Sequence, residues 1–228
     1  MSEGREVDMG NVIGDIVPAA FGVSISPIPL VMLLILLFTE RARVNSVAFL
    51  LGWLAGVTVL LVIAVFVGST LDGGDSSPNG WANLVLGALF VLLAVNSFRT
   101  RPRRDRPDKK PVWMSKLDTI GPLAAFGLSA VLTGINAKNT PIIIASALTI
   151  GSAGLPPGQT VIAAVVFVLV ASSTALVIVL AFLLFGEKVE PALQRLRSWL
   201  EHNNAYVMMF LFGFLGVSAL SNALQAFT

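Results

Sequence analysis

The sequence predicts an all-α integral membrane protein with six transmembrane helices in a 3+3 inverted repeat, helices 1 and 4 being broken at proline-containing segments. Three observations predict this fold class. Of the 228 residues, 55% are hydrophobic and 12% are charged, which is about half the charge of an ordinary soluble domain. Long windows without Asp, Glu, Lys or Arg recur along the chain, and two of them contain a polar, proline-bearing interruption. This composition excludes a soluble enzyme, a nucleic-acid-binding protein and a disordered tail.

The uncharged windows define the spans, because a hydrocarbon core about 30 Å thick needs about 20 apolar residues per helix. The longest window, 139–186, contains a Gly/Pro-rich loop at 151–158, so it holds the end of one span and all of the next. The predicted spans are 11–38, 44–69, 81–98, 119–150, 160–186 and 204–227. The first span is too long, and its flank too acidic, for a cleaved signal peptide.

The basic residues set the orientation of these spans. Thirteen of the 15 Lys and Arg residues lie in three loops, 39–46, 99–118 and 187–203, whereas the loops 70–80 and 151–159 carry none. By the positive-inside rule the three basic loops are cytoplasmic and both termini lie outside. The Arg-rich 99–118 loop could also be read as a nucleic-acid or lipid patch, but a topology determinant resting on anionic headgroups is the better interpretation.

A short amphipathic segment follows the fifth span. Leu193, Leu196 and Leu200 fall on one helical face, with Arg195 and Arg197 turned away. This pattern predicts a short helix lying in the cytoplasmic interface.

The two interruptions indicate an internal repeat. The segment Ser24-Ile-Ser-Pro-Ile-Pro-Leu-Val-Met32 aligns with Asn136-Ala-Lys-Asn-Thr-Pro-Ile-Ile-Ile144, each followed by an apolar half-helix, a loop and a long span. A unit of three crossings must be inverted when it is repeated. We therefore expect a first repeat at 1–98, a basic cytoplasmic linker at 99–118 and a second repeat at 119–228.

Each interruption is predicted to break its helix. The fourth span, 119–150, would measure about 48 Å as one straight helix, far more than the hydrocarbon core. Ser26–Pro27 and Thr140–Pro141 are typical N-cap and N1 pairs, so each is expected to start a half-helix near mid-membrane. The N–H groups and positive dipole ends of these half-helices would then face a shared space.

Lys138 lies two residues before one of these starts, and an ionisable group at such depth is a functional-site hypothesis by default. Two helix N-termini and one ammonium predict a site for an anionic group such as carboxylate, phosphate or sulfate. Alternatively, Lys138 snorkels to an interface or bonds carbonyls that the break frees. The candidate substrate-binding residues are Lys138, Asn136, Asn139, Thr140, Pro141, Ser24, Ser26, Pro27 and Pro29.

Other polar and small residues carry weaker signals. Asp15 lies about 16 Å before Ser26 along a helix; it is interpreted as a first-turn acid favoured by the dipole, with a proton carrier or an ion-pair partner for Lys138 as the alternative. Gly10–Gly14 and Gly52–Gly56 both have the spacing of close helix packing. With no cysteine, no acidic or His cluster and no nucleotide-binding motif, we expect no enzyme activity, metal or cofactor.

The segments Ser24–Leu30, Thr39–Asn45 and Phe49–Trp53 resemble the peptidoglycolipid (sulfolipid) addressing, or GAP, protein family within the lysine exporter superfamily. The segment Asn136–Pro141 resembles the Asn/Pro/Lys motif in the second half of proteins of that superfamily. The resemblance covers essentially the whole chain. It implies transport of glycolipids or other envelope lipids across the bacterial inner membrane, and for the wider superfamily the export of amino acids or ions.

Three functions remain. The favoured one is a transporter or flippase that moves an anionic or glycosylated envelope lipid past Lys138 and the two breaks. The alternative is an exporter of small solutes, amino acids or carboxylates, of the lysine exporter type. A membrane scaffold for an envelope-assembly complex explains the basic loop but not the paired breaks. The expected partners are membrane lipids, envelope-lipid transport or assembly machinery and a second copy of the chain, with no nucleic acid.

Overall fold

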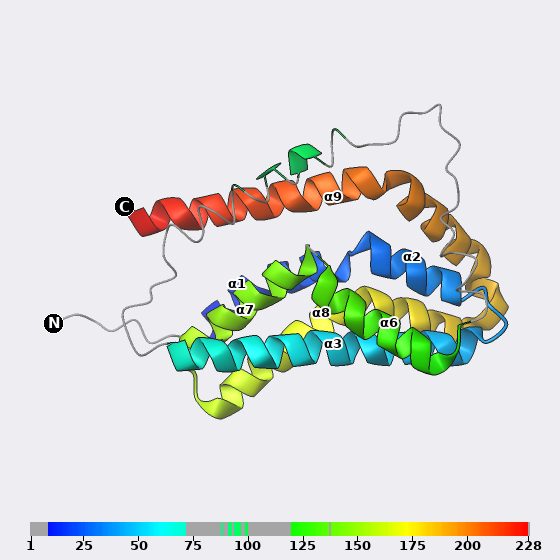
Figure 1. Ribbon diagram of the computed structural model, residues 1–228, viewed down its shortest axis with the longest axis horizontal. Helices are drawn as coiled ribbons and strands as arrows, with labels where there is room; N and C mark the ends of the chain where they lie inside the picture. Colours follow the sequence, from blue (N-terminus) through cyan, green and yellow to red (C-terminus); the bar gives the residue numbers. More distant parts are fainter. Residues whose placement is uncertain are drawn as a thin grey trace.

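The computed structural model describes residues 9–71, 88, 91–92, 94–96, 99, 120–136 and 138–227, and the assigned secondary structure in this part of the chain is helical (Figure 1). The predicted third span, 81–98, and the linker, 99–118, lie largely outside these residues. The helices are α1 (Met9–Ser24), α2 (Pro27–Leu36), α3 (Ala42–Leu71), α6 (Pro122–Ile135), α7 (Asn139–Ser152), α8 (Pro157–Phe185), the 3₁₀ turn η2 (Gly186–Val189) and α9 (Glu190–Phe227).

The described residues contain helices suited to a membrane. Ala42–Phe66 and Pro157–Phe185 are each long and apolar enough to cross a bilayer, and α1 with α2 forms a third candidate span bent by 50° at its break. α6, α7 and Ala205–Phe214 are shorter apolar stretches. The chain is therefore an all-α membrane protein.

The first break falls where the sequence predicts it. α1 ends at Ser24, and Ser26 is the N-cap of α2 in an extended conformation, followed by Pro27 in the first turn. Proline is tolerated there because the first N–H groups of a helix have no intrahelical partner. The predicted break after Ser24 is confirmed.

The second break lies earlier than predicted. α6 ends at Ile135, and α7 already begins at Asn139 with Lys138 as its N-cap. The prediction that Thr140 caps a helix starting at Pro141 is therefore wrong. Pro141 sits in the first turn, at the third position, where a missing N–H is equally harmless.

Two apolar clusters flank the level of the breaks. The α1–α7 cluster includes Ile16, Leu61, Ile143 and Phe167, and the α2–α9 cluster includes Leu34, Phe49, Ile178 and Leu200. α3 and α8 contribute to both clusters, because each runs the length of the bundle (Figure 1). The buried polar residues of the breaks lie at the join between the clusters.

One of the two small-residue motifs makes a close helix contact. A Cβ on Gly52 would collide with the Phe126 carbonyl and the Ser129 hydroxyl, and one on Gly56 would come within 2.8 Å of Thr133 Oγ1. α3 therefore approaches α6 through these glycines, as the spacing predicts. At Gly14, in the other motif, a Cβ would meet nothing within 4 Å, so no close approach is made at that residue.

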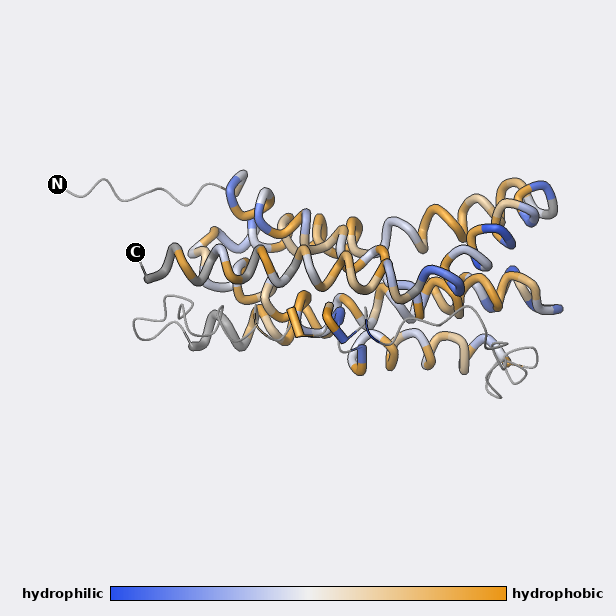
Figure 2. The backbone as a smooth tube through the Cα atoms, turned by 90° about the horizontal axis from the view of Figure 1, so that it is seen from above, coloured by the Kyte–Doolittle hydropathy of each residue, from blue (hydrophilic) through white to orange (hydrophobic). Residues whose placement is uncertain are grey.

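Two of the three segments predicted to be cytoplasmic lie together at one end of the bundle, and the third, 99–118, lies largely outside the described residues. Glu40–Val44, together with Phe182, Gly186 and Glu190, line one open pocket of about 460 Å³, and Figure 2 shows hydrophilic segments gathered at this end. Loops 39–46 and 187–203 thus share a side, as the positive-inside argument requires.

The predicted interfacial helix is the start of α9 rather than a separate element. Its apolar face is used: Leu193 and Leu200 are buried and Leu196 is partly buried, all within the α2–α9 cluster. The face therefore packs on protein, and α2 is among the helices that α9 contacts. The prediction of a separate short helix is wrong, because Pro191–Glu201 continues into the 38-residue helix α9.

Candidate functional site

The two helix breaks are in direct contact. Asn136 Nδ2, between α6 and α7, donates to Ser26 Oγ between α1 and α2, at 3.3 Å. Lys138 Nζ donates to the main-chain carbonyls of Gly22 at 2.8 Å and Ile25 at 3.1 Å. The structure thus brings together the two segments that the internal alignment predicted to be equivalent.

Lys138 is the most unusual of these residues. The residue is only 1% exposed, and its ammonium donates to two uncharged carbonyl oxygens, in the last turn of α1 and just after it. The negative end of a helix dipole attracts a cation. This is the carbonyl-bonding alternative that the sequence left open, although the break still places the ammonium deep in the bundle.

Asn136 organises the start of α7. Its Oδ1 accepts from the N–H of Lys138 at 3.1 Å and from that of Asn139 at 3.3 Å. Its main-chain carbonyl accepts from the N–H of Thr140 at 3.0 Å, and Pro141 has no N–H. The first turn of α7 therefore has its donors satisfied within the protein.

The Thr140 side chain forms hydrogen bonds with the end of α6, the helix that precedes the second break. Its Oγ1 donates to the carbonyls of Thr133 at 3.1 Å and Gly134 at 3.0 Å, in the last turn of α6. These carbonyls have no later helical N–H to accept from. Thr140 therefore stabilises the end of α6, as Lys138 stabilises the end of α1.

The half-helix α2 offers little to an anion through its main chain. Pro27 and Pro29 have no N–H, and the Leu30 N–H donates to the Ser26 carbonyl at 3.1 Å. Only Ile28 retains an N–H in the first three positions. The sequence predicted a shared space lined by free N–H groups of both half-helices. In the structure, α2 contributes at most the Ile28 N–H to that space, and the other available groups are side chains.

Asn139 retains unused hydrogen-bonding capacity. Its side chain is fully buried, and neither Nδ2 nor Oδ1 has a hydrogen-bond partner in the part of the chain that the structure describes. An unsatisfied buried amide costs about 1–3 kcal/mol per group. Its position next to Lys138 makes Asn139 a candidate for binding a polar group.

The remaining predicted residues are placed as follows. Ser24 is buried; its Oγ donates to the Phe21 carbonyl at 2.8 Å and accepts from Thr174 Oγ1 at 3.3 Å. Pro27 and Pro29 are buried in α2. Asp15 lies on an exposed position of α1, and the structure does not bring it to the Lys138 ammonium, which donates to carbonyls instead.

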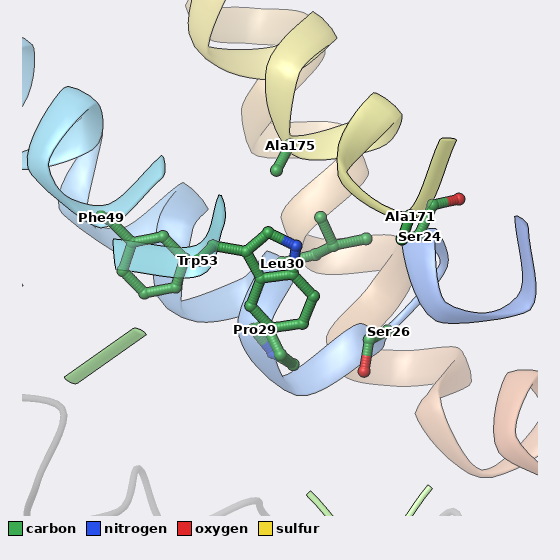
Figure 3. A pocket seen from close by; sticks show the side chains of 8 residues that line it. All are labelled: Ser24, Ser26, Pro29, Leu30, Phe49, Trp53, Ala171 and Ala175. Carbon is green, nitrogen blue, oxygen red and sulfur yellow. The ribbon is translucent and has the colours of Figure 1, made fainter. Parts of the chain in front are cut away.

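A small pocket adjoins the first break, and its main polar residue was not singled out from the sequence. Ser24, Ser26, Pro29, Leu30, Phe49, Trp53, Ala171 and Ala175 line it (Figure 3). Trp53 is 3% exposed, and its indole Nε1 has no hydrogen-bond partner among the described residues. Sequence alone gives no signal for this, because a Trp in an apolar span usually packs in a core.

A comparison with protein families places the chain in one of them. Searches of curated proteins and of solved structures found no match. A family model described as Sap, sulfolipid-1-addressing protein, matches residues 16–225, which include both breaks, Lys138 and the Trp53 pocket. The resemblance seen at Ser24–Leu30 is thereby confirmed, and the chain belongs to the sulfolipid-1-addressing protein family.

Proposed function

We propose that this protein is a transporter that moves a polar-headgroup envelope lipid, anionic or glycosylated, across the bacterial inner membrane. Lys138 binds the anionic part of the headgroup at the junction of the two breaks. The observation that carries the proposal is a buried ammonium, 1% exposed, held by two main-chain carbonyls. The family's name, sulfolipid-1-addressing protein, supports a lipid-related role.

The buried charge of Lys138 has no acidic partner among the described residues. Buried charges in proteins are normally paired, but the ion pair seen in the described part of the chain is Arg197–Glu201, on α9. The carbonyls of Gly22 and Ile25 solvate the ammonium without neutralising it. An anion that reaches Lys138 supplies the missing counter-charge, and the neighbouring amide of Asn139 supplies neutral hydrogen bonds.

The space beside the breaks favours a lipid over a soluble metabolite. Pockets that enclose a small molecule usually measure about 300–1,000 Å³, whereas the pocket that Ser24, Ser26 and Trp53 line, next to the Lys138 junction, has room for about 10 Å³. That pocket cannot enclose a whole metabolite. The apolar remainder of a lipid can stay outside, beside exposed side chains such as Leu123, Leu184 and Phe66.

Lys138 keeps one N–H group for an anion. Two of the three N–H groups of its ammonium donate to the carbonyls of Gly22 and Ile25, so an anion can accept from the third. The same ammonium joins the start of α7 to the end of α1. Headgroup binding and the contact between the breaks therefore involve one side chain.

The packing of the described helices supports the six-span, 3+3 inverted architecture that this mechanism uses. The long helix α3 packs on α6, and the long helix α8 packs on α1, so each long helix contacts the first half-helix of the other repeat. The termini are proposed to lie outside and the basic loops inside. Envelope-lipid machinery and a second copy of the chain remain proposed partners.

The test is lipid movement in proteoliposomes. We expect the purified protein to move fluorescent phosphatidylglycerol, an anionic lipid, between leaflets faster than zwitterionic phosphatidylcholine. Lys138→Gln should abolish this preference, and Lys138→Arg should retain part of it because the charge is kept. Thr149→Val, which removes a hydroxyl bonded within α7, is the matched control and should behave like the parent.

Two results would count against the proposal. Equal phosphatidylglycerol movement by folded Lys138→Gln and parent protein would remove Lys138 from the mechanism. Uptake of amino acids or carboxylates by proteoliposomes, without lipid movement, would favour the small-solute exporter.

A further inference from the structure

The Trp53 pocket differs chemically from the Lys138 junction. No charged residue is among the eight that line it, and most are apolar or small. Its polar groups are the indole of Trp53 and the hydroxyls of Ser24 and Ser26. A charged group would be poorly solvated in these surroundings, so the pocket suits an uncharged ligand.

The available hydrogen bonds specify the ligand atom. Indole Nε1 is a donor only, and in Trp53 it is buried without a partner among the described residues. Ser24 Oγ already donates to the Phe21 carbonyl, and the Ser26 hydroxyl points away from the indole (Figure 3). The indole N–H is therefore the donor that lacks an acceptor, and the atom it binds must be an acceptor.

The size of the pocket limits what can enter. Its volume of about 10 Å³ is close to that needed by one oxygen-sized group such as water. The small side chains of Ala171 and Ala175 on α8 border it, opposite Phe49 and Trp53 on α3 (Figure 3). A single hydroxyl oxygen fits, whereas a phosphate or sulfate group does not.

The pocket and the junction share one chain segment. Ser24 and Ser26 line the pocket, and Gly22 and Ile25, interleaved with them, hold the Lys138 ammonium. A headgroup at the break can therefore reach both sites with different atoms.

Resting on the function proposed above, we infer that the Trp53 indole forms a second subsite that binds an uncharged hydroxyl oxygen of the headgroup while Lys138 binds its charged group. Water occupies the same position when no lipid is bound. Trp53 is then a specificity-determining residue that favours hydroxylated headgroups over unhydroxylated ones of the same charge.

The experiment compares two anionic lipids in proteoliposomes: phosphatidylglycerol, which carries headgroup hydroxyls, and phosphatidic acid, which has none beyond its phosphate. Trp53→Phe keeps an aromatic ring but removes the donor. We expect it to slow phosphatidylglycerol movement by about three- to tenfold, as for one lost hydrogen bond, and to leave phosphatidic acid nearly unchanged. Trp199→Phe, at an exposed position on α9, is the control and should alter neither.

A second measurement does not depend on transport. In nanodiscs of phosphatidylcholine, the indole ¹⁵N–¹H signal assigned to Trp53 through Trp53→Phe should show a cross-peak to water, which is lost when phosphatidylglycerol is added. If no lipid moves but this signal responds as expected, the subsite stands and the transport function fails. Equal slowing of both lipids by Trp53→Phe, or an indole signal without a water contact, would overturn the subsite.

Discussion

The ammonium of Lys138 donates a 2.8 Å hydrogen bond to the main-chain carbonyl of Gly22, 116 positions earlier in the chain. Gly22 lies in the last turn of α1, where carbonyls lack helical partners. The start of one half-helix thus carries the cation that stabilises the end of another, and the breaks depend on each other.

Reversing the charge at Lys138 should damage the fold more than removing it. A carboxylate from Lys138→Glu would face two carbonyl oxygens at the negative end of α1, and we expect a loss of about 3–5 kcal/mol. Lys138→Met removes the buried charge but leaves the carbonyls of Gly22 and Ile25 without their donor, so we expect a smaller loss of about 1–3 kcal/mol. Heating in detergent followed by size-exclusion chromatography measures the thermal stability of each variant. Equal stability of Lys138→Glu and Lys138→Met would contradict this account.

The contact between the breaks can be tested by cross-linking, because the chain has no cysteine. Asn136 Nδ2 and Ser26 Oγ are 3.3 Å apart. The double variant Ser26→Cys with Asn136→Cys should therefore be joined by a short bifunctional thiol reagent, visible as resistance to separation after cleavage of the 99–118 linker. Asp15→Cys with Asn136→Cys should not be joined, and equal cross-linking of both pairs would argue against a specific contact.

The approach of α3 to α6 should tolerate no side chain at Gly52. A methyl group there meets the Phe126 carbonyl and the Ser129 hydroxyl, so Gly52→Ala should destabilise the protein by about 1–3 kcal/mol. Gly14→Ala is the matched control on α1, where a Cβ has open space and alanine favours the helix by about 1 kcal/mol. Thermal unfolding in detergent should separate the variants, and a Gly52→Ala protein as stable as Gly14→Ala would be inconsistent with the helix contact.

The proposed orientation predicts which positions can be labelled from outside. Ser152, Arg41 and Lys188 are all exposed. In spheroplasts, an impermeant maleimide should react with Ser152→Cys directly, but with Arg41→Cys and Lys188→Cys only after permeabilisation. The opposite pattern would reverse the orientation, and labelling of Ser152 and Arg41 from the same side would exclude the proposed spans between them.

The first break was predictable because its cause is local. Two prolines within three residues, preceded by Ser26, leave the helix no alternative start, and α2 begins at Pro27 as expected. At the second break the same reasoning misplaced the start. A first turn accepts proline at more than one position, and the capping group proved to be the Asn136 side chain rather than Thr140.

The sequence predicted which residues form the site, but not which atoms they contact. Lys138, Asn136 and Ser26 do meet, but sequence reasoning considered only the N-terminal ends of the half-helices. The C-terminal ends of α1 and α6 lie at the same level, and their carbonyls take the hydrogen bonds of Lys138 and Thr140. Packing between distant segments decides that Gly52 and Gly56 contact α6 and that Trp53 borders a pocket. Such packing leaves no local pattern in the sequence.

The most direct test of the central claim is the side-chain ¹⁵N signal of Lys138 in bilayers, assigned through Lys138→Arg. In phosphatidylcholine bilayers the chemical shift of the Lys138 ammonium nitrogen should be that of an ammonium hydrogen-bonded to main-chain carbonyls. Adding phosphatidylglycerol should shift it as the anion accepts from the third N–H of the ammonium, while the exposed Lys188 serves as the internal reference for headgroup effects. A Lys138 signal that does not respond, or that only follows Lys188, would contradict the proposal that this lysine binds the headgroup.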